Sequence, residues 1–266
     1  MSSNADECGR VGPSSRERVN WLPFPSKRRR SGLRELMDDP RSDRSRLLAT
    51  LDQFRITNLL FSRSRGLLSR HVIRDMKRLK CGAPAHGPFT VLEVGAGGCD
   101  MAIWLARTCH ARGVPAHITC IDNDPRIGRH ARRRIMASGV SDRVTFQRFS
   151  AFDLDQLPDF DYIICGNTLH HFTEDQTRSL FRLMARKATR KFVASDLERS
   201  SLAWIAYWAF STIFLHGSFA RPDGLLSIAR AYVRSELQAL MPLDAVRPLR
   251  VVRMFPARLC VIGRTW

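Results

Sequence analysis

The chain has 266 residues, of which 44% are hydrophobic, so it can hold one sizeable α/β domain with an appendage. Its formal net charge of +18 suggests nucleic acid, anionic lipid or an acidic substrate as a partner, without choosing among them. The seven cysteines form no Cys-x-x-Cys pair, which indicates a reducing compartment with neither a disulfide framework nor a zinc site. The first 30 residues contain no apolar signal segment, so we expect a cytoplasmic protein.

The first part of the chain precedes any strand pattern. Residues 1–31 are rich in Ser, Pro and Arg and predict a disordered basic tail. Residues 32–82 predict an N-terminal helical cap: a short helical turn, a helix capped by Asp43, and a third helix that ends at Cys81-Gly82. We expect the remaining residues, 83–266, to form the main domain.

A glycine turn follows the first predicted strand. Residues 91–94 are apolar, Gly95, Gly97 and Gly98 come next, and a helix pattern begins beside Asp100, a candidate N-cap. Strand, glycine turn and helix form the first unit of a nucleotide-type α/β fold. The glycines allow positive φ and let a ligand approach the backbone closely. The spacing is neither a dinucleotide Gly-x-Gly-x-x-Gly fingerprint nor a P-loop.

The second predicted strand, residues 116–122, ends in Asp122-Asn123. Its distance from the glycine turn is typical of the carboxylate that accepts hydrogen bonds from ribose hydroxyls. Asp122 or Asp124 could instead cap the next helix. Because Asp124-Pro125 is typical of an N-cap followed by proline, we assign the ribose to Asp122 and the cap to Asp124. The arginine-rich helix that follows, residues 126–138, is expected to be a solvated outer helix rather than an RNA-binding face.

Three more strands are predicted at residues 144–149, 160–165 and 191–195. Ligands of open parallel sheets bind at the carboxyl ends of the strands, so the side chains that follow each strand are candidates for a site. These candidates are Ser150 or Asp153 after the third strand, Asn167, His170 and His171 after the fourth, and Asp196 after the fifth.

The last part of the chain begins with residues 200–220, which carry many aromatic side chains and no formal charge. We expect one helix that forms an apolar wall of an acceptor site, although peripheral membrane contact remains open. Residues 221–230 predict a turn and return, and residues 232–240 a helix. Residues 249–255 and 259–262 predict a closing antiparallel hairpin.

Four of these pieces occur in the order found in a known family. Glu93 to Gly98, Ile121-Asp122, Ser150 to Asp153 and Asn167 to His171 resemble the motifs of class I S-adenosylmethionine-dependent methyltransferases. The resemblance implies an α/β fold with a Rossmann-like, seven-stranded, mostly parallel sheet, an antiparallel C-terminal hairpin and N-terminal helices. It implies S-adenosyl-L-methionine as cofactor, held by residues from this set: Glu93, Gly95, Ala96, Gly97, Asp122, Asn123, Ser150, Ala151, Phe152, Asp153 and Asn167.

The acceptor is suggested by a second, less specific resemblance. Residues 196–199, the aromatic stretch and residues 223–227 are similar to members that methylate phenols, quinones or polyketides at oxygen or carbon in bacterial secondary metabolism. His171 or His170 would then remove the acceptor's proton, since histidine titrates near neutral pH, and Asp196 would line the acceptor pocket.

Two other functions remain open from the sequence. One is an RNA methyltransferase that uses the basic surface, although the fourth strand is not followed by the Asn/Asp-Pro-Pro-Tyr/Phe loop of many base-amino methyltransferases. The other is a non-catalytic scaffold that binds S-adenosylmethionine.

Overall fold

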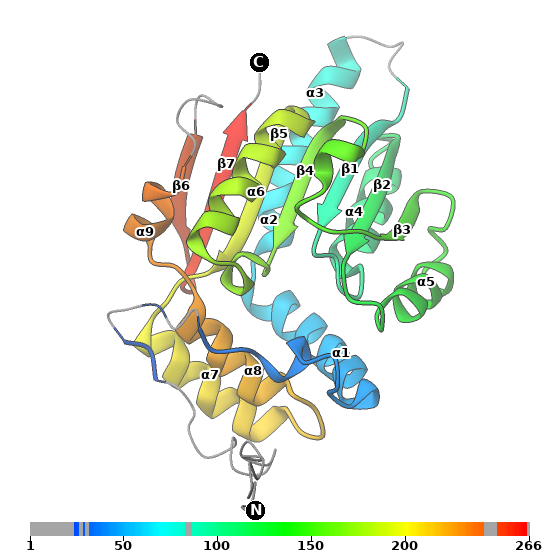
Figure 1. Ribbon diagram of the computed structural model, residues 1–266. Coiled ribbons are helices and arrows are strands. Elements are labelled where there is room, and N and C mark those ends of the chain that lie inside the picture. Colours follow the sequence, from blue (N-terminus) through cyan, green and yellow to red (C-terminus); the bar gives the residue numbers. More distant parts are fainter. Residues whose placement is uncertain (1–23, 27–28, 30–31, 83–86, 242–248, 265–266) are drawn as a thin grey trace, which may run out of the picture.

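The structure is a computed structural model, and it describes residues 24–26, 29, 32–82, 87–241 and 249–264. Within these residues, seven strands form one sheet with the order β3-β2-β1-β4-β5-β7-β6 (Figure 1). The strands are β1 (Phe89–Val94), β2 (Ala116–Asp122), β3 (Val144–Arg148), β4 (Phe160–Gly166), β5 (Ala188–Leu197), β6 (Leu249–Met254) and β7 (Arg258–Arg264).

Strand direction follows the expected Rossmann-like pattern. The pairs among β1 to β5 are parallel, whereas β7 is antiparallel to both β5 and β6. The side chains of β1 and β4 are buried along almost the whole strand, as expected of parallel strands covered on both faces. The prediction of a mostly parallel sheet with an antiparallel C-terminal hairpin is confirmed.

Helices cover both faces of this sheet. One hydrophobic core lies between the sheet and α2 (Ser64–Leu68), α4 (Asp100–Ala111) and α5 (Gly128–Ala137). A second core lies between the sheet and α6 (Glu174–Lys187) and α9 (Arg234–Ala239). Helix α6 begins with a capping box between Thr173 and Gln176.

The N-terminal helices agree with the predicted pattern. A 3-10 turn, η2 (Leu36–Asp38), replaces the expected helical turn, and α1 (Arg44–Phe61) is capped by Asp43, whose carboxylate accepts a hydrogen bond from the Arg46 amide at 2.8 Å. The third helix is continuous from α2 through a π-helical segment, η3 (Ser69–Ile73), into α3 (Arg74–Gly82).

The aromatic stretch forms a shorter helix than expected. Helix α7 (Ser201–Phe214) ends before residue 220, and α8 (Ala220–Arg230) occupies the segment predicted as a turn, so both predictions were wrong there. Pro222 lies in the first turn of α8, where the missing amide needs no partner. Gly224 meets a packing need, because a Cβ at this position would lie 2.2 Å from the Tyr207 hydroxyl.

Helices α1, α7 and α8 lie together beyond the carboxyl edge of the parallel strands (Figure 1). No helix in the described part of the chain is long and apolar enough to cross a membrane.

Most of the predicted basic tail lies outside the described residues, but Arg29 is described and is not part of a free tail. Its guanidinium donates hydrogen bonds to the carbonyls of Arg230 and Phe172, both at 2.6 Å, and lies 3.8 Å from the centre of the Tyr232 ring. The prediction that disorder extends to residue 31 is therefore wrong at Arg29.

Candidate functional site

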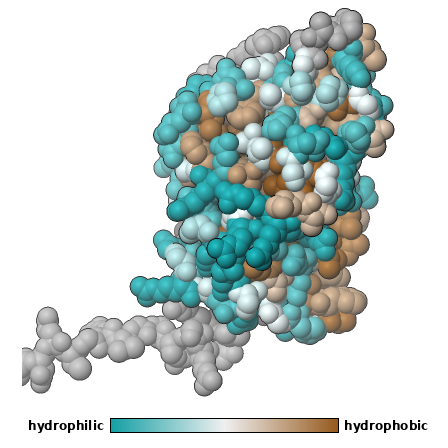
Figure 2. Space-filling view, turned by 90° about the vertical axis from the view of Figure 1, so that its right-hand side faces the viewer, coloured by the Kyte–Doolittle hydropathy of each residue, from teal (hydrophilic) through white to brown (hydrophobic). Residues whose placement is uncertain are grey.

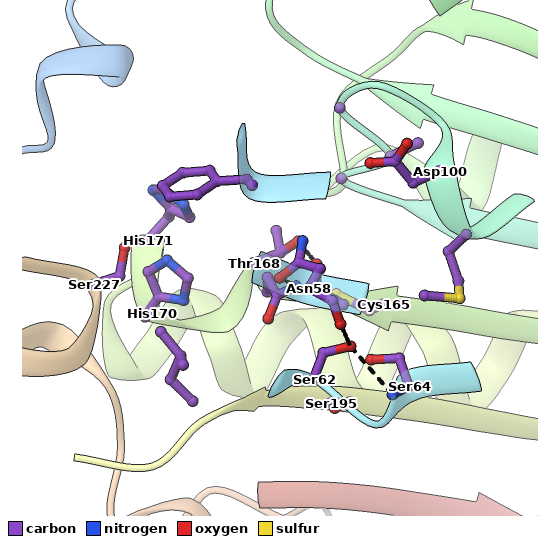
Figure 3. Close-up of a pocket in the computed structure, with 18 of the residues that line it drawn as sticks. Asn58, Ser62, Ser64, Asp100, Cys165, Thr168, His170, His171, Ser195 and Ser227 are labelled. Carbon is purple, nitrogen blue, oxygen red and sulfur yellow. Dashed lines mark hydrogen bonds between the residues drawn. The ribbon is translucent and has the colours of Figure 1, made fainter. Parts of the chain in front are cut away.

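A cavity of about 1000 Å³ lies between the carboxyl edge of the sheet and the helices beyond it (Figure 3). On one side it is lined by the residues that follow β1, β2, β3 and β4. On the other side it is lined by the N-terminal segment around Glu35, the end of α1, and helices α7 and α8. The cavity therefore joins the glycine turn to the aromatic stretch.

The glycine turn presents bare backbone to this cavity. Gly95 and Gly97 have φ values of 68° and 49°, which disfavour a side chain. A Cβ on Gly95 would also lie 2.4 Å from the Thr168 Oγ1 atom. The Ala96 amide donates a hydrogen bond to the Ile121 carbonyl at 3.0 Å, which fastens the turn to β2.

Asp122 lies directly beside this turn, as predicted. Its Oδ2 atom accepts a hydrogen bond from the Gly97 amide at 2.9 Å, and Oδ1 accepts one from the Asp124 amide at 3.0 Å. Each carboxylate oxygen can accept a further hydrogen bond, so Asp122 retains capacity for ligand hydroxyls. Burial raises the pKa of Asp122. Asn123 lines the same cavity.

Asp124 does not cap α5 itself. Its carboxylate accepts a hydrogen bond from the Arg126 amide at 2.8 Å, but the N-cap position of α5 belongs to Ile127. Residues 125–127 form a turn before α5 begins. Asp124 therefore stabilises this turn and not the helix itself.

The buried Glu93 connects β1 to α4. Its Oε2 atom accepts a hydrogen bond from the Ala102 amide in the first turn of α4 at 3.0 Å. Burial, with the nearby charge of Asp100, raises the pKa of Glu93 to about 8. The prediction that Asp100 caps this helix was wrong. Cys99 holds the N-cap position, and Asp100 forms an ion pair with Arg134. Glu93 accepts the hydrogen bond of a first-turn amide that an N-cap side chain would otherwise accept.

The structure separates the two alternatives left open after the third strand. Ser150, Ala151 and Phe152 line the cavity, whereas Asp153 is exposed, lies outside the lining and precedes a 3-10 turn, η4 (Leu154–Gln156). Of the two candidates, Ser150 is thus the one that lines the cavity.

Asn167 lines the cavity at the end of β4 in a left-handed conformation, with φ of 53°. Its side-chain amide donates a hydrogen bond to the Asn58 side chain of α1 at 3.1 Å, and its backbone amide donates one to the Ser195 carbonyl at 2.9 Å. Arg258 donates a hydrogen bond to its side-chain oxygen. Asn167 therefore joins the sheet edge to α1.

The two histidines of η5 (Leu169–His171) have different surroundings. The His170 side chain is 4% exposed, and both its backbone amide, at 2.9 Å, and its Nδ1 atom, at 2.8 Å, contact the Asp196 carboxylate. Burial acts to raise the pKa of Asp196, but the charge and hydrogen bond of His170 hold it at about 2. These contacts fix the loop, and they give Asp196 the role of holding His170 in place.

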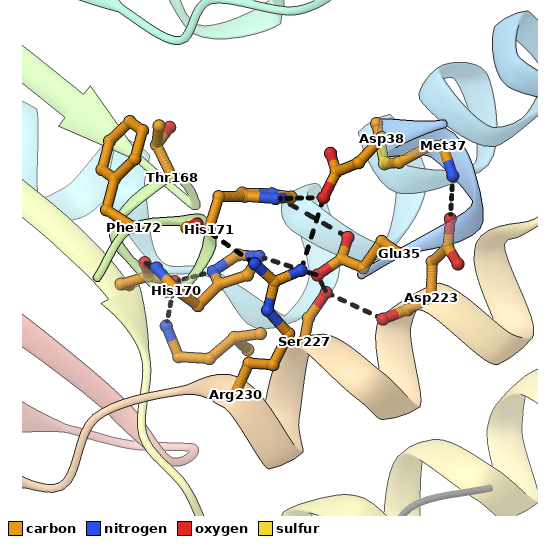
Figure 4. Close-up of polar contacts among 12 residues, drawn as sticks. Glu35, Met37, Asp38, Thr168, His170, His171, Phe172, Asp223, Ser227 and Arg230 are labelled. Atoms are coloured by element: carbon orange, nitrogen blue, oxygen red, sulfur yellow. Dashed lines mark hydrogen bonds and ion pairs between the residues drawn. The ribbon is translucent and has the colours of Figure 1, made fainter. Parts of the chain in front are cut away.

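His171 is the more open of the two, with its side chain 22% exposed. Its Nδ1 atom lies 3.1 Å from Asp38 Oδ2, and its Nε2 atom lies 3.8 Å from Glu35 Oε2 (Figure 4). Burial acts to lower the pKa of His171, but the charges of Glu35 and Asp38 raise it to about 9. His171 is therefore a basic imidazole that borders the cavity.

Glu35 is the centre of this cluster, and the sequence analysis missed it. The residue is 2% exposed, and its Oε1 atom lies 2.9 Å from the Ser227 hydroxyl and 3.5 Å from the Arg230 guanidinium. Its Oε2 atom accepts no hydrogen bond from any residue that the structure describes. A buried carboxylate oxygen without a donor is a candidate for contact with a ligand.

Helix α8 holds the Glu35 segment in place. Asp223 accepts hydrogen bonds from the amides of Leu36, at 2.7 Å, and Met37, at 2.9 Å. Burial, with the charge of Glu35, raises the pKa of Asp223 to about 7. No local pattern marks Glu35, since its partner Ser227 is 192 residues away. The only hint was the resemblance noted at residues 223–227.

Glu35, His170 and His171 could also hold a divalent cation. Each offers one ligand atom, and these three atoms lie within 4.8 Å of one another. The Arg230 guanidinium lies 3.5 Å from Glu35 Oε1 and 3.3 Å from Asp38 Oδ2. It therefore already places a fixed positive charge beside these two carboxylates. This charge disfavours a second cation at the same place.

Helix α7 supplies the apolar wall expected from the aromatic stretch. Ala203, Ala206, Tyr207 and Phe210 line the cavity, and the Phe210 ring contacts the Phe61 ring of α1 with a centroid distance of 5.2 Å. The cavity is thus polar beside the histidines and apolar beside α7.

Comparisons with known proteins agree with this geometry. Residues 91–203 match a family model described as a methyltransferase domain. An uncharacterised protein of Synechococcus is 37% identical over 125 residues, which are 45% of this chain and 29% of that protein. The chain therefore matches less than a third of the length of this curated relative.

Two solved structures share the fold. One is a candidate O-methyltransferase from Nostoc punctiforme, with 18% identity, a TM-score of 0.50, and coverage of 74% of this chain and 58% of the other. The second is the DszA carbon methyltransferase, with 15% identity, a TM-score of 0.51, and coverage of 73% and 52%.

Proposed function

We propose that the chain is a class I S-adenosylmethionine-dependent methyltransferase that methylates a small aromatic or lipophilic acceptor, such as a phenol, a quinone or a polyketide. One observation carries the proposal. A single cavity runs from the glycine turn and Asp122 to His171 and the apolar wall of α7. It offers room for a cofactor at one end and an apolar acceptor at the other.

The residues at the sheet edge fit the cofactor. Gly95 and Gly97 line the cavity with backbone alone, so the methionine portion could lie directly against this turn. Asp122 would accept hydrogen bonds from the ribose hydroxyls, and Ser150 with Phe152 would lie beside the adenine. When bound, S-adenosylmethionine supplies an activated methyl group together with its own leaving group.

The protein's own contribution is to position the acceptor and to remove its proton. Because His170 is fixed by Asp196, His171 is the better candidate for the general base. Its Nε2 atom would accept the proton of a phenol or enol, and the carboxylates of Glu35 and Asp38 would stabilise the resulting imidazolium. The pKa of His171, about 9, is close to the usual pKa of a phenol, about 10, which makes this proton transfer nearly balanced.

The test is a screen of phenols, quinones and aromatic polyketides with isotopically labelled S-adenosylmethionine, read by mass spectrometry. The proposal requires transfer of the labelled methyl group to at least one acceptor and loss of that transfer in His171→Gln. Glu174→Gln, an exposed residue in the first turn of α6, is the control. Binding of the cofactor without transfer to any acceptor would favour the non-catalytic scaffold, and methylation of RNA alone would favour the basic-surface alternative.

A further inference from the structure

Large hydrophobic side chains are exposed on α1, on α7 and in the turn between β6 and β7, which also supply residues to the lining of the cavity. Figure 2 shows hydrophobic surface along the lower right edge of the molecule, in the half that holds α1, α7 and α8 in Figure 1. These side chains are between 38% and 78% exposed. We call them the apolar rim: Ile56, Leu59, Leu60, Phe61, Leu202, Ile205, Ile213, Phe214 and Phe255.

The rim is continuous with the cavity. Leu60, Phe61 and Phe255 belong to the rim and also line the cavity. The Phe210 ring, inside the cavity, contacts Phe61 on α1 and lies 4.9 Å from the Phe214 ring on α7. A ligand leaving the apolar end of the cavity would therefore meet the rim.

The outward face of α7 differs from that of an ordinary surface helix. Leu202, Ile205 and Ile213 repeat at helical spacing, and Trp208 and Ala209 are also exposed between them. A surface helix of a water-soluble domain normally carries polar or charged residues on this face, whereas α7 contains no charged residue at all. Exposed apolar patches of this kind mark contact with another apolar phase or partner.

The surroundings of the rim are positively charged. Residues 53–74, 199–222 and 249–264, which supply the rim, contain arginines but no aspartate or glutamate. Arg55, Arg63 and Arg65 are exposed in the first of these segments, and the Arg63 guanidinium lies 5.9 Å from the centre of the Phe255 ring of the rim. Apolar side chains surrounded by arginines fit the interface of an anionic bilayer. The apolar side chains can enter the acyl region, and the arginines can contact the lipid phosphates.

We propose that the apolar rim docks on an anionic lipid bilayer, so that the cavity opens into the membrane and a lipophilic acceptor enters from the lipid. This inference rests on the proposed function for the identity of the site, but the docking can be tested separately. Helix α7 lies in the interface and does not span it, in agreement with its length of 14 residues.

The experiment is sedimentation of the full chain with vesicles of phosphatidylcholine, with and without phosphatidylglycerol. The protein should bind the anionic vesicles, and binding should weaken as NaCl is raised. The variant Leu202→Ser/Ile205→Ser/Ile213→Ser should bind at least about tenfold more weakly, since each change removes an apolar side chain from the interface. None of these three side chains lines the cavity.

Met136→Ser is the matched control for Ile213→Ser. Met136 is 71% exposed on α5 and lies outside the rim, and Ile213 is 65% exposed within it. Absence of binding to anionic vesicles would overturn the proposal, as would equal weakening by Met136→Ser and Ile213→Ser. A stable dimer that the triple variant dissociates, with no vesicle binding, would assign the face to a second copy of the chain and would also overturn it.

Calorimetry with S-adenosylmethionine on the same samples separates this inference from the proposed function. Normal cofactor binding without vesicle binding would refute the docking alone. Vesicle binding without cofactor binding would refute the proposed function alone. The triple variant should still methylate a short, water-soluble phenol that the wild type accepts, and should lose turnover on a long-chain phenol presented in vesicles.

Discussion

Glu35 Oε2 lies 3.8 Å from His171 Nε2, and this carboxylate comes from a segment that precedes the first strand of the sheet. With Asp38 on the other ring nitrogen, Glu35 raises the pKa of His171 to about 9, against the lowering effect of burial. The N-terminal segment therefore sets the protonation of the candidate base on the loop after β4.

The pH profile of turnover should report this relationship. His171 can accept a proton only when neutral, so kcat/KM should rise with pH up to about 9. In Glu35→Gln one carboxylate charge is lost, the pKa of His171 falls, and the rising limb should move to lower pH by about one unit or more. Glu174→Gln should leave the limb in place, and an unchanged limb in Glu35→Gln would refute the assignment.

The buried pair of His170 and Asp196 should be important for stability. In Asp196→Asn, His170 loses a buried ionic partner, so we expect the free energy of unfolding in urea to fall by about 3 kcal/mol. Asp155→Asn, at an exposed pair with Arg186, should change it by less than about 0.5 kcal/mol. Equal effects of the two changes would show that the buried pair contributes little.

The same pair predicts a pH dependence in acid. The pKa of Asp196 is about 2 in the folded protein against an ordinary 3.8, so the ionised carboxylate stabilises the fold above pH 3.8. This contribution is lost as the pH falls from 3.8 to about 2. The stability of the wild type, measured by urea titration, should therefore decline more steeply over this range than that of Asp196→Asn.

The glycine turn offers a matched pair of substitutions. Gly95 and Gly139 have φ values of 68° and 65°, so alanine costs about 1 to 2 kcal/mol of backbone strain at either position. Only at Gly95 would the added Cβ meet Thr168, because Gly139 has open space around it. Gly95→Ala should weaken S-adenosylmethionine binding about tenfold or more, whereas Gly139→Ala should not. Similar affinities of the two variants would argue against close contact at the turn.

Metal removal should have little effect. Arg230 already supplies a positive charge 3.5 Å from Glu35, so the cluster of Glu35, His170 and His171 does not require a divalent cation. Dialysis against EDTA should leave methyl transfer unchanged. Loss of activity that returns with added zinc or manganese would show that the cluster is a metal site.

The sheet and the cofactor half of the site could be predicted because their signals are local. Short segments rich in apolar residues mark the parallel strands, and glycines mark the turn after β1. Asp122 could be assigned from its distance along the chain to that turn, since a βαβ unit fixes this spacing.

The carboxylates of the acceptor half, Glu35 above all, could not be predicted because their contacts join distant segments. Glu35 is held by Ser227 and Arg230 of α8, and neither end of these contacts has a distinctive local pattern. Helix α8 itself was missed because Arg221-Pro-Asp-Gly224 is typical of a turn. The proline fits the first helical turn and the glycine makes room for Tyr207, which only the packed structure shows.

The most direct test of the account is calorimetric titration of S-adenosylmethionine into the wild type and into Asp122→Ala. Asp122 joins the end of β2 to the Gly97 amide and lies beside the bare backbone of the turn. We predict measurable affinity in the wild type and its loss in the variant, with both proteins folded by circular dichroism. Unchanged affinity in Asp122→Ala would contradict the assignment of this carboxylate and of the cofactor site built around it.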